Sequence, residues 1–199
     1  MNLVPNKSDT ALKEWAVTVD ALGRGEQIVI IRKGGIHKED KEFRIIHPEF
    51  LLFSTYEHQK NELLKVPYHK RLREIEKAKD SNRFVKFEYW ASVTAMFETR
   101  DESDLEKISD KHLWTEAYAA SRFHWRPSQP LTVALLKVFR LKDPIIIESL
   151  PQFAGCKSWV DLQPAIRLPD MTPVLNEMDY DTEASIITES LADSLVSFK

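Results

Sequence analysis

The chain has 199 residues, of which 43% are hydrophobic and 30% are charged, proportions typical of a globular protein with a buried core. No apolar run approaches the roughly 20 residues of a membrane helix, and the N-terminus lacks a charged-then-apolar signal region. The single cysteine, Cys156, excludes an intrachain disulfide and is typical of a reducing compartment. We therefore expect a soluble cytoplasmic protein without a membrane partner.

The net charge of -3 is unevenly distributed along the chain. The segment 170–199 carries seven acidic residues and one basic residue, which leaves 27 basic and 24 acidic residues in the body of the protein. An acidic tail on a mildly basic body can shield a nucleic-acid-binding surface. The alternative, which the weak apolar pattern favours, is a solvated and partly disordered tail that contributes few core positions.

The first half of the chain predicts a helix, two strands and a broken helix. Apolar residues at helical spacing predict a helix over 9–22, and Gly23 lies where a left-handed C-terminal residue is preferred. The apolar runs 28–31 and 50–53 predict two paired strands around a polar hairpin loop at 36–43. Residues 55–79 then have a helical pattern that breaks near Pro67.

The second half predicts two long strands around helical segments. Residues 84–97 alternate between apolar and polar, with Trp90 as an exception on the polar face. Helices are expected over 103–124, and 131–147 reads as a second long strand. The predicted fold is α+β, with a long bent antiparallel sheet or small barrel and flanking helices. The expected units are an N-terminal lobe (1–80), a strand-helix-strand lobe (81–169) and the acidic tail (170–199).

An anion site is the first functional candidate. A predicted buried strand ends on Arg32, Lys33, Gly34 and Gly35, where two cations precede two flexible backbone amides. Such a loop can surround an anion, and we expect it to lie near His58. Glycine pairs more often serve turns alone, which is the alternative interpretation.

Two further segments are candidates for nucleic-acid contact. The segment 65–86 carries eight basic and three acidic residues, whereas a helix that is polar on every side is more often a solvated surface. The helix near 111–125 has an aromatic stripe flanked by arginines, which can stack bases but is more often part of the core. The predicted contacts are Lys70, Arg71, Arg73, Lys77, Arg83, Trp90, Arg122, Trp125 and Arg126.

Signals for catalysis are weaker. If the protein is an enzyme, the polar residues of the 27–59 segment predict a hydrolytic site built from His47, Glu57 and His58, with Arg32 and Lys33 holding an anion. His37, His47 and His58 match no compact metal motif, and no phosphate loop or dinucleotide fingerprint occurs. We therefore predict no metal site and no cofactor.

Several motifs occur together in a specific order: RKGGI at 32–36, HPEFLLFSTYEHQ at 47–59, YWASV at 89–93, WRPSQPLTVALLKVFRL at 125–141 and GCKSWVDL at 155–162. In this combination, over about residues 10 to 170, the chain resembles the bacterial family known as domain of unknown function 1802. Ser54 departs from the proline that is common before Thr55 in that family. The family has no established activity and implies no catalytic residue for this chain.

The resemblance implies a partner, because similar proteins are sometimes fused to or grouped with Mrr-type endonuclease domains. A restriction-type nuclease and a role beside restriction-modification are therefore expected. The order of strand, helix and PLTVALLKVFRL is also similar to RNA-binding barrel domains of the PUA and ASCH kind, as an analogy of pattern. The leading hypothesis is a non-catalytic nucleic-acid-binding or specificity module, and the alternative is the hydrolytic enzyme.

Overall fold

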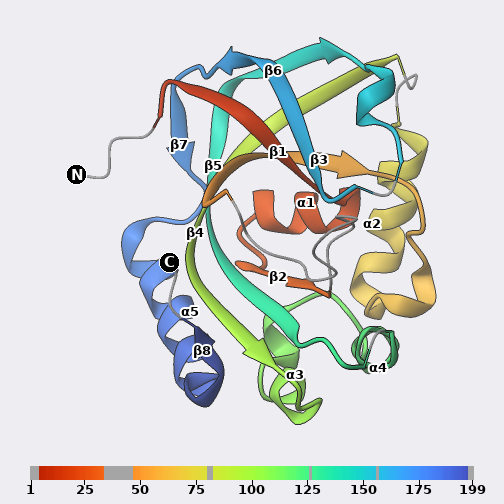
Figure 1. The fold of residues 1–199 in the computed structure, drawn as a ribbon, viewed down its shortest axis with the longest axis vertical. Helices are drawn as coiled ribbons and strands as arrows, with labels where there is room; N and C mark the ends of the chain where they lie inside the picture. Colours follow the sequence, from red (N-terminus) through yellow and green to blue (C-terminus); the bar gives the residue numbers. More distant parts are fainter. Residues whose placement is uncertain (1–4, 34–46, 80–82, 126, 156, 197–199) are drawn as a thin grey trace.

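The computed structural model describes residues 5–33, 47–79, 83–125, 127–155 and 157–196. Helices and strands are mixed along the chain, and the long strands curve around α1 (Figure 1). The elements are β1 (Lys7–Trp15), α1 (Ala16–Gly23), β2 (Val29–Arg32), β3 (Glu49–Thr55), η1 (Asn61–Leu63), α2 (Val66–Lys77), β4 (Phe84–Thr99), α3 (Ser103–Lys107), η2 (Ser109–Lys111), α4 (Glu116–His124), β5 (Leu131–Glu148), η3 (Pro151–Phe153), β6 (Trp159–Arg167), β7 (Met171–Pro173), α5 (Glu177–Ser190), η4 (Ala192–Ser194) and β8 (Leu195–Val196).

One mixed sheet organises the described residues, and the predicted α+β class is confirmed. The strand order is β2-β5-β4-β3-β1-β6, with β7 paired to β5 and β8 paired to β4. The pair β1–β3 is parallel, whereas the other pairs are antiparallel. Among the described strands, β2 and β6 end this order without pairing to each other, so the sheet does not close into a barrel.

The two long strands predicted from the sequence are confirmed as β4 and β5, which have 16 and 18 residues and pair with each other. Their register shifts between Phe87 and Tyr89 and again between Val93 and Ala95. An extra residue in one strand increases its local twist and bends it. These two irregularities therefore accompany the curvature that both strands show in Figure 1.

The predicted helix over 9–22 is wrong in its first half, because residues 7–15 form β1. This strand pairs with β3 on one side, in the register Ala11↔Leu51, and with β6 on the other, in the register Ala11↔Val160. The apolar residues at helical spacing that suggested a helix are also compatible with a strand buried between two neighbours. Two hydrogen-bonded ladders therefore override the local helical pattern.

The predicted pairing of 28–31 with 50–53 is also wrong. In the structure β2 pairs with β5, in the register Val29↔Leu135, whereas β3 lies between β1 and β4. The hairpin loop expected at 36–43 lies outside the described residues. Sequence order suggested a hairpin because consecutive strands often pair, but here longer-range partners take both positions.

Two glycines shape the end of α1 in different ways. Gly25, with φ at 71°, takes the left-handed conformation expected earlier at Gly23. A Cβ atom on Gly23 would instead lie 2.2 Å from Cζ of Tyr89, because the tyrosine ring packs directly against the helix end. The Tyr89 hydroxyl accepts a hydrogen bond from Arg140, which also donates to the Gly23 carbonyl oxygen. Gly23 is thus needed for close packing.

The broken helix predicted over 55–79 is only one helix, α2, which begins at Val66. Pro67 lies in its first turn, where a missing backbone N–H costs nothing because that group has no helical partner. The proline therefore starts the helix instead of interrupting it. The preceding residues form the end of β3, a turn and η1.

The segment after Pro169 is more ordered than the acidic composition suggested. It forms β7 and α5, and Tyr180, Ile187 and Leu191 are buried in the same core cluster as Tyr118. Among the residues of this segment whose burial is described, only these three are buried, but the expectation of partial disorder is wrong over β7 and α5. The three predicted units all contribute strands to one sheet, so their boundaries divide the chain but not this sheet. Within the described residues no helix is long and apolar enough to cross a membrane.

Candidate nucleic-acid interface

The end of β2 holds Arg32 in a network of protein partners. Its guanidinium donates to Oε2 of Glu14 at 3.1 Å, to the Lys13 carbonyl oxygen at 3.2 Å and to Oγ of Ser158 at 2.6 Å. Glu14 is buried and also accepts a hydrogen bond from the Trp15 backbone N–H at 2.8 Å. This arrangement joins β1, β2 and the start of β6. We call Glu14, Arg32 and Ser158 the polar centre.

Lys33 is likewise directed at the protein. Its ammonium donates to the Phe123 carbonyl oxygen at 2.9 Å and lies 5.1 Å from the centre of the Phe123 ring. Burial and the nearby charge of Arg100 lower the pKa of the Lys33 ammonium. Gly34 and Gly35 lie outside the described residues. The anion site therefore stays a prediction, with both of its cations engaged in contacts of their own.

The aromatic stripe of α4 is mainly core, as the plainer alternative expected. Trp114 and Tyr118 stack with ring centroids 5.1 Å apart, and both are buried. Burial raises the pKa of the Tyr118 hydroxyl. Arg122 covers the same ring at 4.9 Å, whereas Trp125 at the helix end is 42% exposed. Arg126 lies outside the described residues, so its predicted contact stays a prediction.

The residues of the hydrolytic alternative are separated by β3. His47 precedes the strand and its ring packs against Trp159 at 5.3 Å. Glu57 and His58 follow the strand in an exposed turn, where His58 has φ at 63°. Seven strand residues at about 3.3 Å each place the two ends roughly 20 Å apart. The structure therefore does not bring His47 together with Glu57 and His58.

The basic segment divides between two faces of α2. Lys70, Arg73 and Lys77 are exposed and follow one another at i, i+3 and i+7 along the helix. Arg71 points toward α1, where it forms ion pairs with Asp20 and, at 3.5 Å, with Glu26. Arg71 is therefore tied to the fold and does not share the outer stripe. Figure 1 shows α2 at the edge of the molecule that also carries the beginning of β4.

The beginning of β4 adds an exposed aromatic residue that the sequence reasoning missed. Phe84 is 51% exposed, and the Arg83 guanidinium lies 5.3 Å from its ring centre. Trp90, the predicted exposed aromatic, is only 3% exposed and packs on Phe139 at 5.3 Å. The signal for Phe84 was available, because it precedes Lys86 by two residues and so shares its polar face.

We call Lys70, Arg73, Lys77, Arg83, Phe84 and Lys86 the cationic face. Three of its acidic neighbours are paired: Glu74 lies 3.6 Å from Lys70, Glu88 lies 2.9 Å from Lys86, and Glu148 lies 4.0 Å from Arg83. Glu76 is a further exposed carboxylate on α2. Arg73 and Lys77 have no ion pair among the described residues. Arg73 and Lys77, the two cations at the C-terminal end of the stripe, are thus available to an anionic partner.

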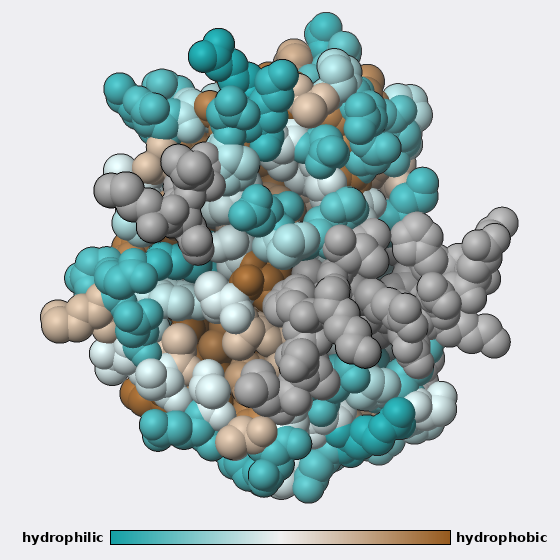
Figure 2. All heavy atoms as spheres, turned by 60° about the vertical axis from the view of Figure 1, so that its left-hand side comes forward, coloured by the Kyte–Doolittle hydropathy of each residue, from teal (hydrophilic) through white to brown (hydrophobic). Residues whose placement is uncertain are grey.

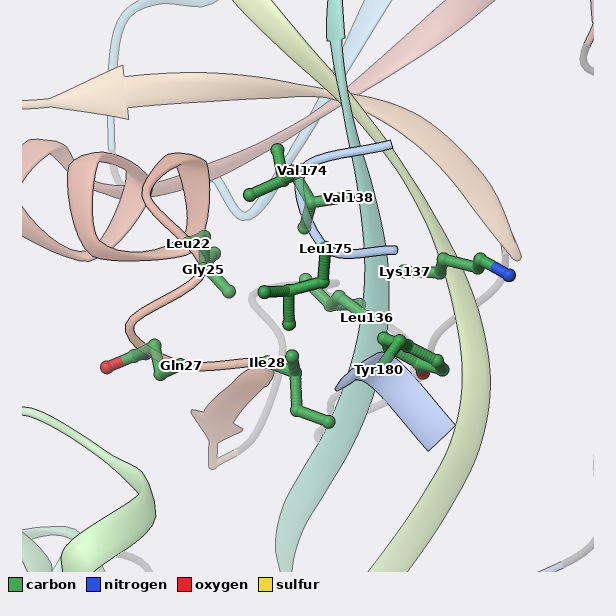
Figure 3. A pocket seen from close by; sticks show the side chains of 10 residues that line it. All are labelled: Leu22, Gly25, Gln27, Ile28, Leu136, Lys137, Val138, Val174, Leu175 and Tyr180. Atoms are coloured by element: carbon green, nitrogen blue, oxygen red, sulfur yellow. The ribbon is translucent and has the colours of Figure 1, made fainter. Parts of the chain in front are cut away.

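The smaller of two cavities does not match a small-molecule site. A cavity beneath the α1–β2 turn has about 10 Å³, enough for about one water. Figure 3 shows Leu175 at its centre, close to Leu22, Gly25 and Leu136. Ligand pockets usually enclose roughly 300–1,000 Å³ and are mostly apolar. We therefore assign this cavity to packing.

A larger groove of about 740 Å³ is open and polar, and five acidic side chains line it. Its carboxylates would repel a phosphate backbone. Figure 2 shows a third environment, a shallow central hollow where hydrophobic residues reach the surface among mostly hydrophilic ones. Among the described residues no group of three or more His, Cys, Asp and Glu side chains is arranged to hold a metal ion.

Comparison with known proteins gives one strong match and several weak ones. The family model described as "Domain of unknown function (DUF1802)" matches residues 11–185, as the motifs in the sequence predicted. Among curated proteins no significant match is found. The match reaches beyond Pro169 and includes most of α5.

Solved structures of an ASCH protein from Zymomonas mobilis are similar at a low level. The ASCH structure is 11% identical, covers 96% of this chain and 97% of its own, and has a TM-score of 0.44. A point mutant of that protein is 13% identical, covers 92% and 99% of the two chains, and has a TM-score of 0.41. Likeness at this level is too weak to bear on the function of the present chain.

Proposed function

The chain belongs to the family described as domain of unknown function DUF1802, and from its geometry we propose that it is a non-catalytic nucleic-acid-binding module. The cationic face is the proposed contact surface. The single observation that carries the proposal is the outer stripe of α2, in which three exposed cations share one side of a helix.

The spacing of this stripe suits a repeating negative charge. Residues three or four positions apart on a helix have Cβ atoms about 5–6 Å apart, so Lys70, Arg73 and Lys77 form a short row. Cations in such a row can each neutralise a phosphate and release condensed counterions. Because long side chains on an exposed helix face lose little packing on rearrangement, the row can adapt to its ligand.

The folded C-terminal segment changes the interpretation of the acidic tail. Two of its carboxylates already contact the body, because Glu177 lies 2.5 Å from Lys137 and Glu183 lies 3.0 Å from Lys111. The tail therefore neutralises specific lysines of the fold. We propose that its remaining acidic groups weaken nucleic-acid binding only through the overall field of the protein.

The proposal is tested by reversing the charge of the stripe. The variant Lys70→Glu/Arg73→Glu/Lys77→Glu is compared with a control, Lys7→Glu/Lys142→Glu/Arg167→Glu, which changes three exposed cations away from α2 by the same total charge. Fluorescence anisotropy with labelled single- and double-stranded oligonucleotides at about 50 mM salt gives the affinities. We expect the α2 variant to bind at least about tenfold more weakly than the control.

Two outcomes contradict the proposal. If the native protein does not bind at low salt, the proposed function is refuted. If the two triple variants lose equal affinity, the assignment of the contact surface to α2 is refuted. The partnership with a restriction-type nuclease stays a prediction that comes from the family resemblance. The cytoplasmic location stays a prediction that comes from the sequence.

A further inference from the structure

We propose that the end of the β4–β5 ribbon is a stacking platform for unpaired bases, so that the ligand of the cationic face is a single-stranded nucleic acid. This inference rests on the proposed function and specifies its ligand. It starts from three exposed apolar side chains at this end of the molecule, Phe84, Ile146 and Leu150, which are 51%, 63% and 38% exposed.

The register of the ribbon places Phe84 and Ile146 on one face. Phe84 pairs with Glu148 and Lys86 pairs with Ile146, so all four side chains point to the same side of the sheet. The opposite side buries Val85 and, without residual exposure, Phe87. The ribbon is therefore held rigidly from behind while its outer face presents an aromatic and an aliphatic side chain.

A guanidinium lies over the exposed ring. The Arg83 guanidinium lies 5.3 Å from the centre of the Phe84 ring, and the Arg83 carbonyl oxygen accepts a hydrogen bond from the Ser149 N–H at 2.7 Å. This hydrogen bond holds the backbone next to the ring in place. An aromatic ring next to a guanidinium can stack a base and neutralise the adjacent phosphate.

This combination discriminates between kinds of nucleic acid. In a duplex the faces of the bases are covered by their neighbours, so only an unpaired base can stack on Phe84. Figure 1 shows the end of α2 and the start of β4 at the same edge of the molecule. A single strand can therefore contact the α2 row through its phosphates and the ribbon through a base.

The charges around the exposed apolar side chains also argue against an apolar protein as the ligand of this surface. The apolar groups are bordered by Arg83 and Lys86, which are 72% and 52% exposed, and the α2 row follows. The acidic neighbours Glu148 and Glu88 each lie within 4.0 Å of one of these cations. A phosphate that approaches Arg83 competes with Glu148, so removal of that carboxylate charge should favour binding.

The test compares Phe84→Ala, Phe84→Trp and Glu148→Gln by anisotropy with oligo(dT), oligo(U) and a duplex of equal length. We expect Phe84→Ala to weaken single-strand binding roughly tenfold, as loss of one stacked base should, and to weaken duplex binding much less. Phe84→Trp should restore single-strand affinity and Glu148→Gln should increase it. Sedimentation of each variant measures the oligomeric state in parallel.

The outcomes separate this inference from the proposed function. If the α2 charge reversals abolish binding while Phe84→Ala leaves single-strand affinity unchanged, the module binds nucleic acid but the stacking platform is refuted. If Phe84→Ala changes only the sedimentation coefficient, the patch joins two copies of the chain and the inference is equally refuted. If the native protein binds none of the probes, both proposals fail.

Discussion

The polar centre and the cationic face use the same residue types for opposite purposes. Arg32 has three protein acceptors within 3.2 Å, whereas Arg73 has no ion pair among the described residues. On α2 itself, Arg71 binds Asp20 and Glu26, but Arg73, two residues later, points to solvent. A count of basic residues therefore overstates a binding surface, because part of the charge holds the fold together.

The largest expected effect on the free energy of unfolding comes from comparing the same substitution, arginine to methionine, in the polar centre and in the cationic face. Arg32→Met keeps an apolar stem but leaves the buried Glu14 carboxylate without its ion pair, so the free energy of unfolding should fall by about 3 kcal/mol. Arg73→Met should change it by less than about 0.5 kcal/mol, as expected at an exposed site. Urea denaturation of both variants measures the difference. Equal losses would contradict the division into two regions.

A second pair of neighbours tests how far the interior region extends into the acidic segment. Ile187 has no exposed surface, whereas Ile186 is 41% exposed. We expect Ile187→Ala to lower the free energy of unfolding by about 3 kcal/mol through lost burial and a residual cavity. Ile186→Ala should change it by less than about 0.5 kcal/mol. Similar small values for both would mean that α5 is not part of the core.

The interior should also respond to acid, through His112. This residue is buried, and neither of its ring nitrogens has a hydrogen-bond partner among the described residues. Its ring lies 5.6 Å from Trp114, and its carbonyl oxygen accepts a hydrogen bond from Lys65 at 2.7 Å. Burial, together with the charge of Lys65, lowers the pKa of His112 from 6.5 to about 4.

The sign of this effect follows from the unfolded chain, which takes up the proton more readily. Above about pH 6.5 the protonation of His112 does not lower the free energy of unfolding. As the pH falls from there toward 4, the free energy of unfolding decreases by about 3 kcal/mol in total. Urea denaturation between those pH values should show this decline. In His112→Phe the decline should largely disappear, whereas it should persist in His124→Gln, at an exposed site. An unchanged decline in His112→Phe would refute the assignment.

The sequence predicted those elements that can be recognised from the hydrophobic pattern of their own residues. The alternation over 84–97 and the apolar run from Leu131 predicted β4 and β5, and both are confirmed. The segment 7–15 was misassigned because its state depends on β3 and β6, which approach it from distant parts of the chain. Long-range pairing of this kind leaves no local signal that separates it from a helix.

The candidate contact residues were predictable only in part, for a similar reason. The alternation of side chains between the two faces of a strand predicted Trp90 on the polar face of β4. The register shift after Phe87 instead puts Phe87 and Trp90 in one buried cluster and Tyr89 in another. Beyond a bulge, the residues that face each side of the sheet are exchanged, and the bulge itself is not visible in the sequence. Before the bulge the parity holds, which is why the exposure of Phe84 could have been predicted.

The salt dependence of binding tests the central claim most directly. For the native protein and for Lys70→Glu/Arg73→Glu/Lys77→Glu, the affinity for a labelled single strand is measured between about 50 and 200 mM salt. We predict a log-linear decline for the native protein, with a slope whose magnitude is smaller by about 2 in the variant, since each phosphate contact contributes about 0.7. Identical slopes in the two proteins would show that the α2 stripe does not contact the phosphates and would contradict the account.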